Sequence, residues 1–141
     1  MFSDTPLDTP PSPDAPIDSL ANLTVAVNKF VEQRDWEQFH NPKNLSMALI
    51  VEAAELVEHF QWLSRQESNT LDQEQHDAVA LEMADVLIYL VRMAARMDID
   101  LLEAAQKKLL LNDKKYPVDQ VKGRADKYTQ YQTKYQRESN P

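Results

Sequence analysis

The sequence predicts an all-α protein, on the strength of three observations. Apolar residues recur every three or four positions in four segments between residues 20 and 115, as on one face of a helix. Residues that commonly begin or end helices flank these segments. No segment shows the apolar–polar alternation of a β-strand. The 141 residues favour one domain, and we expect a four-helix bundle over residues 19–120.

The two flanking segments differ in composition from this core. Residues 1–18 contain five of the eight prolines, and we expect a disordered leader because so little apolar surface could be buried. This segment lacks the basic and apolar regions of a signal peptide, and no apolar run approaches the ~18 residues of a membrane span. We therefore expect a cytoplasmic protein without a membrane partner. Residues 121–141 are basic and rich in tyrosine, and this tail could be helical or loose.

The first two helices have recognisable beginnings. The first is expected over residues 20–35, with Ser19 as its N-cap and an apolar stripe that includes Val27 and Phe30. The second is expected to begin after Asn41, a cap residue followed by Pro42 at the first helical position, and to run to about Leu63.

The third and fourth helices follow a polar connection. The third is expected over residues 71–97. Asp100 and Glu103 predict the start of the fourth, which should reach about Lys115 before Pro117 stops it. Four such helices make a thin core, so we expect exposed leucines at 101–102 and 109–111 to be covered by another chain.

Charge and composition exclude several classes of protein. The net charge of −8 argues against a nucleic-acid polymer as partner. The absence of cysteine rules out disulfides, thiolate metal sites and cysteine nucleophiles. The single glycine, Gly123, rules out Walker and Rossmann phosphate loops, which need several glycines. If the chain binds a nucleotide, side chains and metal must hold the phosphates.

Two pairs of acidic residues interrupt apolar helical runs. Glu52 and Glu55 share one face of the second helix, and Glu82 and Asp85 share one face of the third. Four carboxylates on core-forming helices need a cation, unless these faces are ordinary solvated ones. Oxygen ligands suit Mg²⁺, with Mn²⁺ as the alternative. A di-iron bundle is a weaker alternative, because it needs Glu-x-x-His on two helices.

Cationic and aromatic residues could hold a substrate next to this metal site. The candidates for phosphate are Arg92 and Arg96 on the third helix and a polar stripe on the fourth, namely Lys108, Asn112 and Lys115. The candidates for stacking on a base are Trp36, Phe39, His40, Trp62 and Tyr89. Lysines near a helix C-terminus and aromatics in a core are also common without any ligand.

Four motifs resemble the all-α nucleoside triphosphate pyrophosphatases of the MazG-like superfamily, and most of all their dCTP pyrophosphatase branch. They are RDWEQFHNPKNL, EAAELVEHFQW, EMADVLIYLVRMA and NDKKYP, within about residues 20–125. Two positions depart from the family pattern: Val27 stands where a histidine is expected, and Lys115 stands where arginine is usual. These departures bear on base preference more than on the reaction.

The resemblance implies a Mg²⁺-dependent hydrolase that splits dCTP or a related, modified pyrimidine deoxynucleotide into monophosphate and pyrophosphate, a house-cleaning activity. It implies metal ligands Glu52, Glu55, Glu82 and Asp85, and among these we expect Glu55, or else Glu52, to orient the attacking water. It implies substrate contacts from Trp36, His40, Trp62, Tyr89, Arg96, Lys108, Asn112, Lys115 and Tyr116. It also implies a homodimer, or a homotetramer built from dimers.

Two alternatives remain open from the sequence. Within the same reaction, dUTP or a broad set of deoxynucleotides could be the substrate. In a different class, the chain could be a non-catalytic helical module whose acidic faces bind a metal or a basic partner. Release of pyrophosphate from a nucleotide, only with Mg²⁺ present, separates the two classes.

Overall fold

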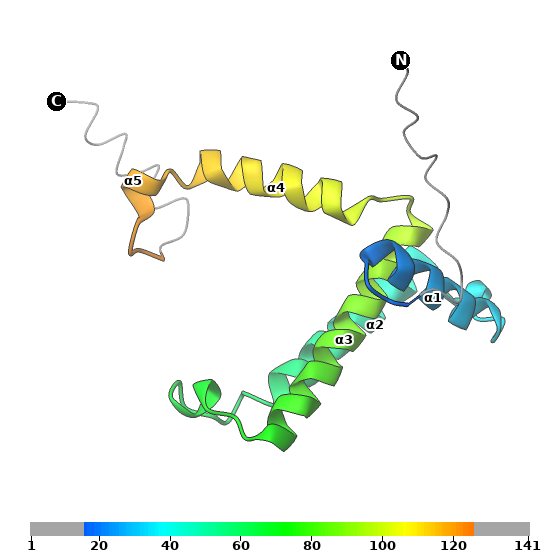
Figure 1. Cartoon of the computed structure of the whole chain (residues 1–141), viewed down its shortest axis with the longest axis horizontal. Helices are drawn as coiled ribbons and strands as arrows, with labels where there is room; N and C mark the ends of the chain where they lie inside the picture. The colour runs from blue at the N-terminus through cyan, green and yellow to red at the C-terminus, as the bar shows by residue number, and fades with distance from the viewer. Residues whose placement is uncertain (1–15, 126–141) are drawn as a thin grey trace, which may run out of the picture. The chain divides into compact units, whose positions relative to one another are not determined.

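The computed structural model describes residues 16–125, and every regular element within that range is a helix. The α-helices, labelled in Figure 1, are α1 (Leu20–Glu32), α2 (Pro42–Glu58), α3 (Gln73–Arg96), α4 (Leu101–Lys115) and α5 (Val118–Val121). The predicted all-α class is therefore confirmed for this range. The predicted leader and tyrosine-rich tail fall largely on residues 1–15 and 126–141, outside the described residues.

The chain divides into two units between Ile99 and Asp100. The first unit contains α1, α2 and α3, and the second contains α4 and α5. The predicted fourth helix is thus present as α4, and each unit is described by itself. The expected domain boundaries at residues 19 and 120 stay predictions.

Three of the predicted helix starts are confirmed by their cap contacts. The Ser19 hydroxyl accepts from the Asn22 amide, and the Asn41 side chain accepts from the Asn44 amide just before Pro42. Asp100 accepts from the amides of residues 102 and 103 at the start of α4. Such contacts satisfy amides that have no partner inside the helix.

Three predicted boundaries are wrong. The first helix ends at Glu32 and not near Asp35, which has a φ of 52° and leaves the right-handed helical region. α2 ends at Glu58, four turn residues before Leu63. α3 begins after Asp72, whose side chain and that of Gln75 form a reciprocal capping box, and not at residue 71.

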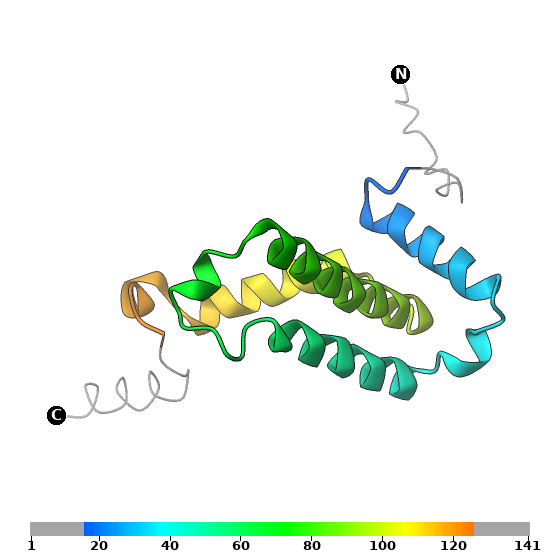
Figure 2. The ribbon, with the colours of Figure 1, turned by 90° about the horizontal axis from the view of Figure 1, so that it is seen from below.

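The core of the first unit lies where α1 and α2 both pack against α3. Figure 2 shows α2 and α3 side by side and antiparallel, joined by a loop that contains a 3-10 helix, Glu67–Asn69. A second 3-10 helix, Glu37–Phe39, connects α1 to α2. The buried apolar side chains are Val27, Val31, Leu45, Val91 and Ala94.

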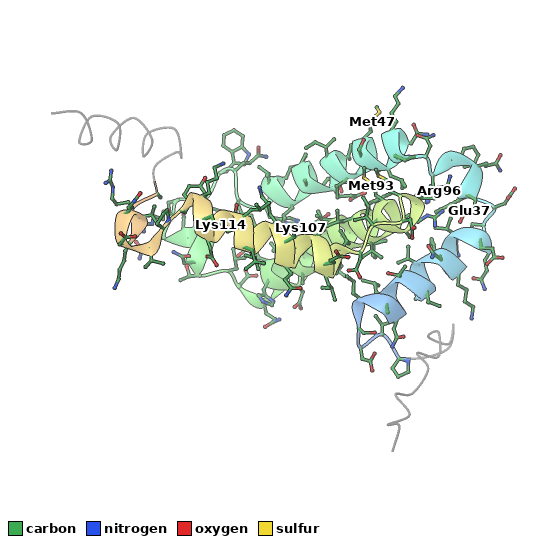
Figure 3. The ribbon with its side chains drawn as sticks, turned by 90° about the horizontal axis from the view of Figure 1, so that it is seen from above. Glu37, Met47, Met93, Arg96, Lys107 and Lys114 are labelled. Carbon is green, nitrogen blue, oxygen red and sulfur yellow. The ribbon has the colours of Figure 1, made fainter. Side chains whose placement is uncertain are left out.

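Beyond this small core, α2 and α3 expose a large apolar area. Met47 lies on the outer side of α2 (Figure 3), and Ile50 on the same helix is 67% exposed. Leu81 on α3 is 69% exposed. Exposed apolar surface of this extent is typical of a face that another chain covers. Among the described residues, no helix combines the length and apolar character that crossing a membrane requires.

Candidate active site

The antiparallel contact of α2 with α3 brings three of the four predicted carboxylates together. One oxygen each from Glu52, Glu82 and Asp85 lies within 4.8 Å of the other two. The three-residue spacing on α3 aims Glu82 and Asp85 at the same side, and α2 supplies Glu52 opposite them. We call these three residues the acidic cluster. An all-oxygen donor set of this size could bind a divalent metal ion.

Glu55 lies one turn further along α2 and outside the cluster. Its side chain is exposed, whereas Glu52 and Glu82 are half-buried. His59, at the C-terminal end of α2, has its Nε2 3.7 Å from Glu82 Oε1. The predicted role of Glu55 as a metal ligand stays a prediction.

The electrostatics of the cluster favour a cation. Burial raises the pKa of Glu52, and the neighbouring charges of Glu55, Asp85 and Glu82 raise it further. Burial also raises the pKa of Tyr89, and the charges of Glu52 and Asp85 add to this effect. Tyr89 consequently keeps its proton at neutral pH and can donate a hydrogen bond beside the carboxylates.

A cavity of about 350 Å³ lies next to the cluster, between α1 and α3. Its α1 wall is apolar and includes Val27 and Phe30, while Ile88 and Tyr89 line it from α3. Asp85 belongs both to the cavity wall and to the acidic cluster. The volume lies within the range of small-molecule sites. The arrangement places an apolar pocket beside a group of carboxylates that could bind a cation.

Trp36 and His40 line the cavity from the connection between α1 and α2. The Trp36 ring meets Phe30 edge-on with centroids 5.8 Å apart, and its centroid lies 6.4 Å from that of His40. The guanidinium of Arg34 lies 3.5 Å from the Phe30 ring centroid. These contacts hold the aromatic rings in defined orientations against the cavity.

Trp62 is not part of this cavity in the single chain. It lies in the turn after α2 and is 88% exposed. Three of the five candidates for stacking on a base, Trp36, His40 and Tyr89, are therefore brought together, whereas Trp62 and the 58% exposed Phe39 do not line the cavity. The contact of Trp62 with a substrate stays a prediction.

Arg92 occupies a position that the sequence did not indicate. The residue was expected to face phosphate together with Arg96, but its side chain is 4% exposed. Its Nη1 donates to Asn28 Oδ1 at 2.8 Å, and its Nε donates to His40 Nδ1 at 3.2 Å. Its Nη2 lies 2.6 Å from Glu37 Oε2, a close ion pair that is poorly directed for a hydrogen bond.

Arg96, one turn further along α3, is more accessible. Its Nη1 lies 3.5 Å from Glu37 Oε2, and Figure 3 shows the two side chains near each other. The Arg96 side chain is 42% exposed. The expected phosphate contact thus fits Arg96 better than Arg92. No local spacing could have separated the two arginines, because the partners Asn28 and His40 are 64 and 52 residues from Arg92 in the sequence.

The other predicted phosphate contacts lie in the second unit. Lys108 is exposed on α4, and Asn112 on the same helix is half-buried. The Lys115 ammonium lies 5.6 Å from the centroid of the Tyr116 ring, and the Tyr116 amide donates to the Asn112 carbonyl at 2.8 Å. Their roles toward a substrate stay predictions.

Comparison with known proteins finds the same family from sequence and from structure. The model of the MazG-like family matches residues 47–130. A dCTP pyrophosphatase 1 from Rattus norvegicus is 42% identical over 120 residues, which cover 84% of this chain and 69% of that protein. The Homo sapiens dCTP pyrophosphatase 1 is 39% identical over 121 residues, with the same two coverages.

A solved structure agrees with these relatives. The crystal structure of a pyrophosphatase from Archaeoglobus fulgidus superposes with a TM-score of 0.63 and is 38% identical to this chain. The match covers 65% of this chain and 86% of that one. At this identity, the likeness extends beyond the fold to the family of the two proteins.

Proposed function

The chain belongs to the MazG-like family, and from this membership we propose that it is a dCTP pyrophosphatase. The relatives named dCTP pyrophosphatase 1 support the reaction and the cytosine nucleotide. The expected products are the nucleoside monophosphate and pyrophosphate. We also propose that the modified cytosine nucleotides are substrates and that the enzyme clears them from the cytoplasmic nucleotide pool.

One structural observation carries this proposal: the apolar cavity and the acidic cluster share Asp85. A nucleoside triphosphate has an aromatic base at one end and a strongly anionic chain at the other. The cavity, with Trp36 and His40, suits the base. The acidic cluster suits a cation-bound phosphate, since carboxylates alone would repel it.

The acidic cluster fits a hard divalent ion, and we propose Mg²⁺ as the resident metal. Glu52, Glu82 and Asp85 would hold it, with Glu55 as a further ligand or neighbour. When bound, such an ion neutralises phosphate charge and lowers the pKa of coordinated water. The raised pKa of Glu52 is consistent with a site that is short of positive charge.

The remaining steps fall to the side chains of this chain. We propose that Glu55 accepts a proton from the water that attacks the α-phosphorus, because its exposed carboxylate lies one turn from the cluster. The new bond is water oxygen to α-phosphorus, and the bond to the bridging oxygen breaks to release pyrophosphate. Tyr89 donates a hydrogen bond near the carboxylates, and Arg96 binds phosphate. Lys108, Asn112, Lys115 and Tyr116 are proposed to hold the leaving pyrophosphate.

We further propose that a second copy of this chain covers the apolar face of α2 and α3. The exposed residues that carry this proposal are Met47, Ile50, Val51, Val57, Leu81, Met83 and Leu87. Contact with another copy would also shield Trp62, which is too exposed in one chain to stack on a base. We expect light scattering after size exclusion to give a dimer or a tetramer. A stable monomer would contradict this part.

A pyrophosphate-release assay tests the reaction itself. We expect pyrophosphate release from dCTP in Mg²⁺ and none in EDTA. The rates with dUTP and with purine nucleotides are measured in parallel to establish which base is preferred. Release led by dUTP, or spread across the bases, would keep the acidic cluster and reject the cytosine assignment. No release from any nucleotide would contradict the proposed function and favour a metal-binding module.

A further inference from the structure

We propose that Arg92 is a positioning residue that sets base selectivity by fixing the tautomer of His40. This inference rests on the proposed function. Arg92 holds the His40 ring with its proton on Nε2, so the cavity offers a hydrogen-bond donor to the base. Cytosine presents an acceptor at N3, whereas uracil presents an N3–H donor. If Nε2 meets N3 of the base, this tautomer pairs with cytosine and opposes uracil, so Arg92 favours cytosine at that position.

The tautomer follows from the direction of one hydrogen bond. Arg92 Nε donates to His40 Nδ1 at 3.2 Å, and a guanidinium nitrogen carries no lone pair with which to accept. Nδ1 must therefore be the unprotonated nitrogen of the neutral ring. The single imidazole proton is then on Nε2.

The arginine itself cannot adjust to a different ring orientation. Asn28 on α1 accepts from Nη1 at 2.8 Å, and Glu37 lies 2.6 Å from Nη2. With His40 on Nε, three residues from α1 and from the connection after it surround the planar guanidinium, and Arg92 is 4% exposed. A ring flip of His40 would leave a buried donor unpaired.

The ring is also kept neutral. The pKa of His40 lies below its ordinary value, first because of burial and then because of the charge of Arg92. Arg96 lowers the pKa further, and Glu37 opposes this effect. A doubly protonated ring would offer a donor on Nδ1 directly against another donor.

The apolar part of the cavity wall strengthens the effect of this donor, and Trp36 and Tyr89 bring further N–H and O–H groups to the cavity. Of the described residues that line the cavity, His40 is the only histidine, and the α1 wall around Val27 is apolar. In such surroundings a donor that meets another donor loses its hydrogen bond without compensation from water. Sites built around a hydrogen bond discriminate strongly against a partner that cannot make it.

Kinetics on Arg92→Met and Arg92→Lys test the inference. We expect Arg92→Met to lower the ratio of kcat/KM for dCTP to that for dUTP by about 10- to 100-fold, chiefly through KM for dCTP. Arg92→Lys retains a donor for Nδ1 and should recover part of the ratio. The matched control, Arg65→Met, makes the same change at an exposed arginine outside the cavity lining and should keep the ratio. A folded Arg92→Met protein with an unchanged ratio would contradict the inference.

Nitrogen NMR on the wild-type protein gives a readout that does not depend on a variant folding. We expect the His40 resonances, assigned with His40→Gln, to show protonated Nε2 and unprotonated Nδ1. Deoxycytidine should shift the Nε2 resonance more than deoxyuridine does. A proton on Nδ1, or equal shifts, would overturn the inference.

The two proposals fail in different ways. A wild-type protein that releases no pyrophosphate refutes the proposed function, while the NMR titration still tests the role of Arg92. A wild-type protein that is active but prefers dUTP refutes the role of Arg92 and leaves the reaction intact.

Discussion

The two ends of the candidate site are built in contrasting ways. The acidic cluster is half-open and consists of like charges held close together by two neighbouring helices. The arginine end is buried, and Arg92 there meets partners of complementary charge and hydrogen-bonding capacity from distant parts of the sequence. The first end is electrostatically incomplete without a ligand, whereas the second is largely complete within the chain. Reactivity is expected at the first end and selectivity at the second.

The largest effect is expected from removing a carboxylate at the open end. Glu55→Gln should lower kcat/KM by about 10²- to 10⁴-fold, because an amide cannot accept the proton of the attacking water. Unfolding by urea should change little, since Glu55 is exposed. Glu58→Gln, the same change at an exposed position on α2, is the control and should keep full activity. Near-normal turnover by the Glu55 variant would reject this assignment.

A stability effect without a comparable activity effect is expected at the buried end. Asn28→Ala leaves Arg92 Nη1 without its acceptor and should lower the free energy of unfolding by about 1–3 kcal/mol. Because Arg92 still contacts His40, kcat for dCTP should stay within a few-fold of wild type. Asn69→Ala, at an exposed loop position, serves as the comparison and should be nearly neutral. Equal unfolding midpoints for the two variants would mean that the guanidinium is not anchored through α1.

A smaller effect, whose sign depends on the metal, is expected at Glu52. Its raised pKa means that the folded chain holds this proton more tightly than the unfolded chain does. The resulting stabilisation is present at low pH and is lost as the pH rises through the folded pKa. In EDTA at pH 7, Glu52→Gln should therefore raise Tm, because it removes a carboxylate that the cluster repels.

With saturating Mg²⁺ at pH 7, the wild-type protein should instead have a higher Tm than Glu52→Gln. The reason is that the ion binds the ionised wild-type cluster and not the unfolded chain. Thermal unfolding of both proteins at pH 4 and pH 7, with EDTA and with Mg²⁺, makes the comparison. A wild-type protein that is the more stable of the two in EDTA at pH 7 would contradict repulsion within the cluster.

The smallest effect expected is a change in the pH dependence of stability, caused by His40. Its lowered pKa means that the unfolded chain binds this proton more readily, so stability falls as the pH drops below about 6.5. His40→Gln should weaken that part of the pH dependence. Urea midpoints between pH 8 and pH 5 would show it as a flatter profile for the variant. Parallel profiles would indicate that the burial of His40 does not perturb its titration.

The same contrast explains what the sequence could predict. Three helix starts were predicted correctly, because Ser19, Asn41 and Asp100 act on amides two or three residues away. The spacing of Glu82 and Asp85 predicted their shared face in the same way, and the structure brings Glu52 to them, whereas the role of Glu55 stays a prediction. These features depend on local geometry, which the order of residues largely determines.

Features that depend on distant contacts were missed. Arg92 and Arg96 are one helical turn apart and chemically identical, and both lie near Glu37, yet only Arg92 is buried and bonded to Asn28 and His40. The predicted end of the first helix was also wrong, because the chain leaves the helical conformation before Asp35, which has a positive φ. The exposure of Trp62 could not be foreseen, because the number of copies that assemble is not encoded in local spacing.

The position of Asp85 on the same helix as Arg92 has a consequence for which substrates fit at all. The two residues are two turns apart on α3, about 10 Å along its axis. Asp85 belongs to the acidic cluster, and Arg92 donates to His40, the residue proposed to contact the base. A continuous α-helix resists stretching, so α3 fixes the distance between the proposed phosphate end and the proposed base end of the site. Compounds whose base and α-phosphate are spaced differently, such as those with an extended sugar linkage, should fail by length even when their hydrogen bonds are correct.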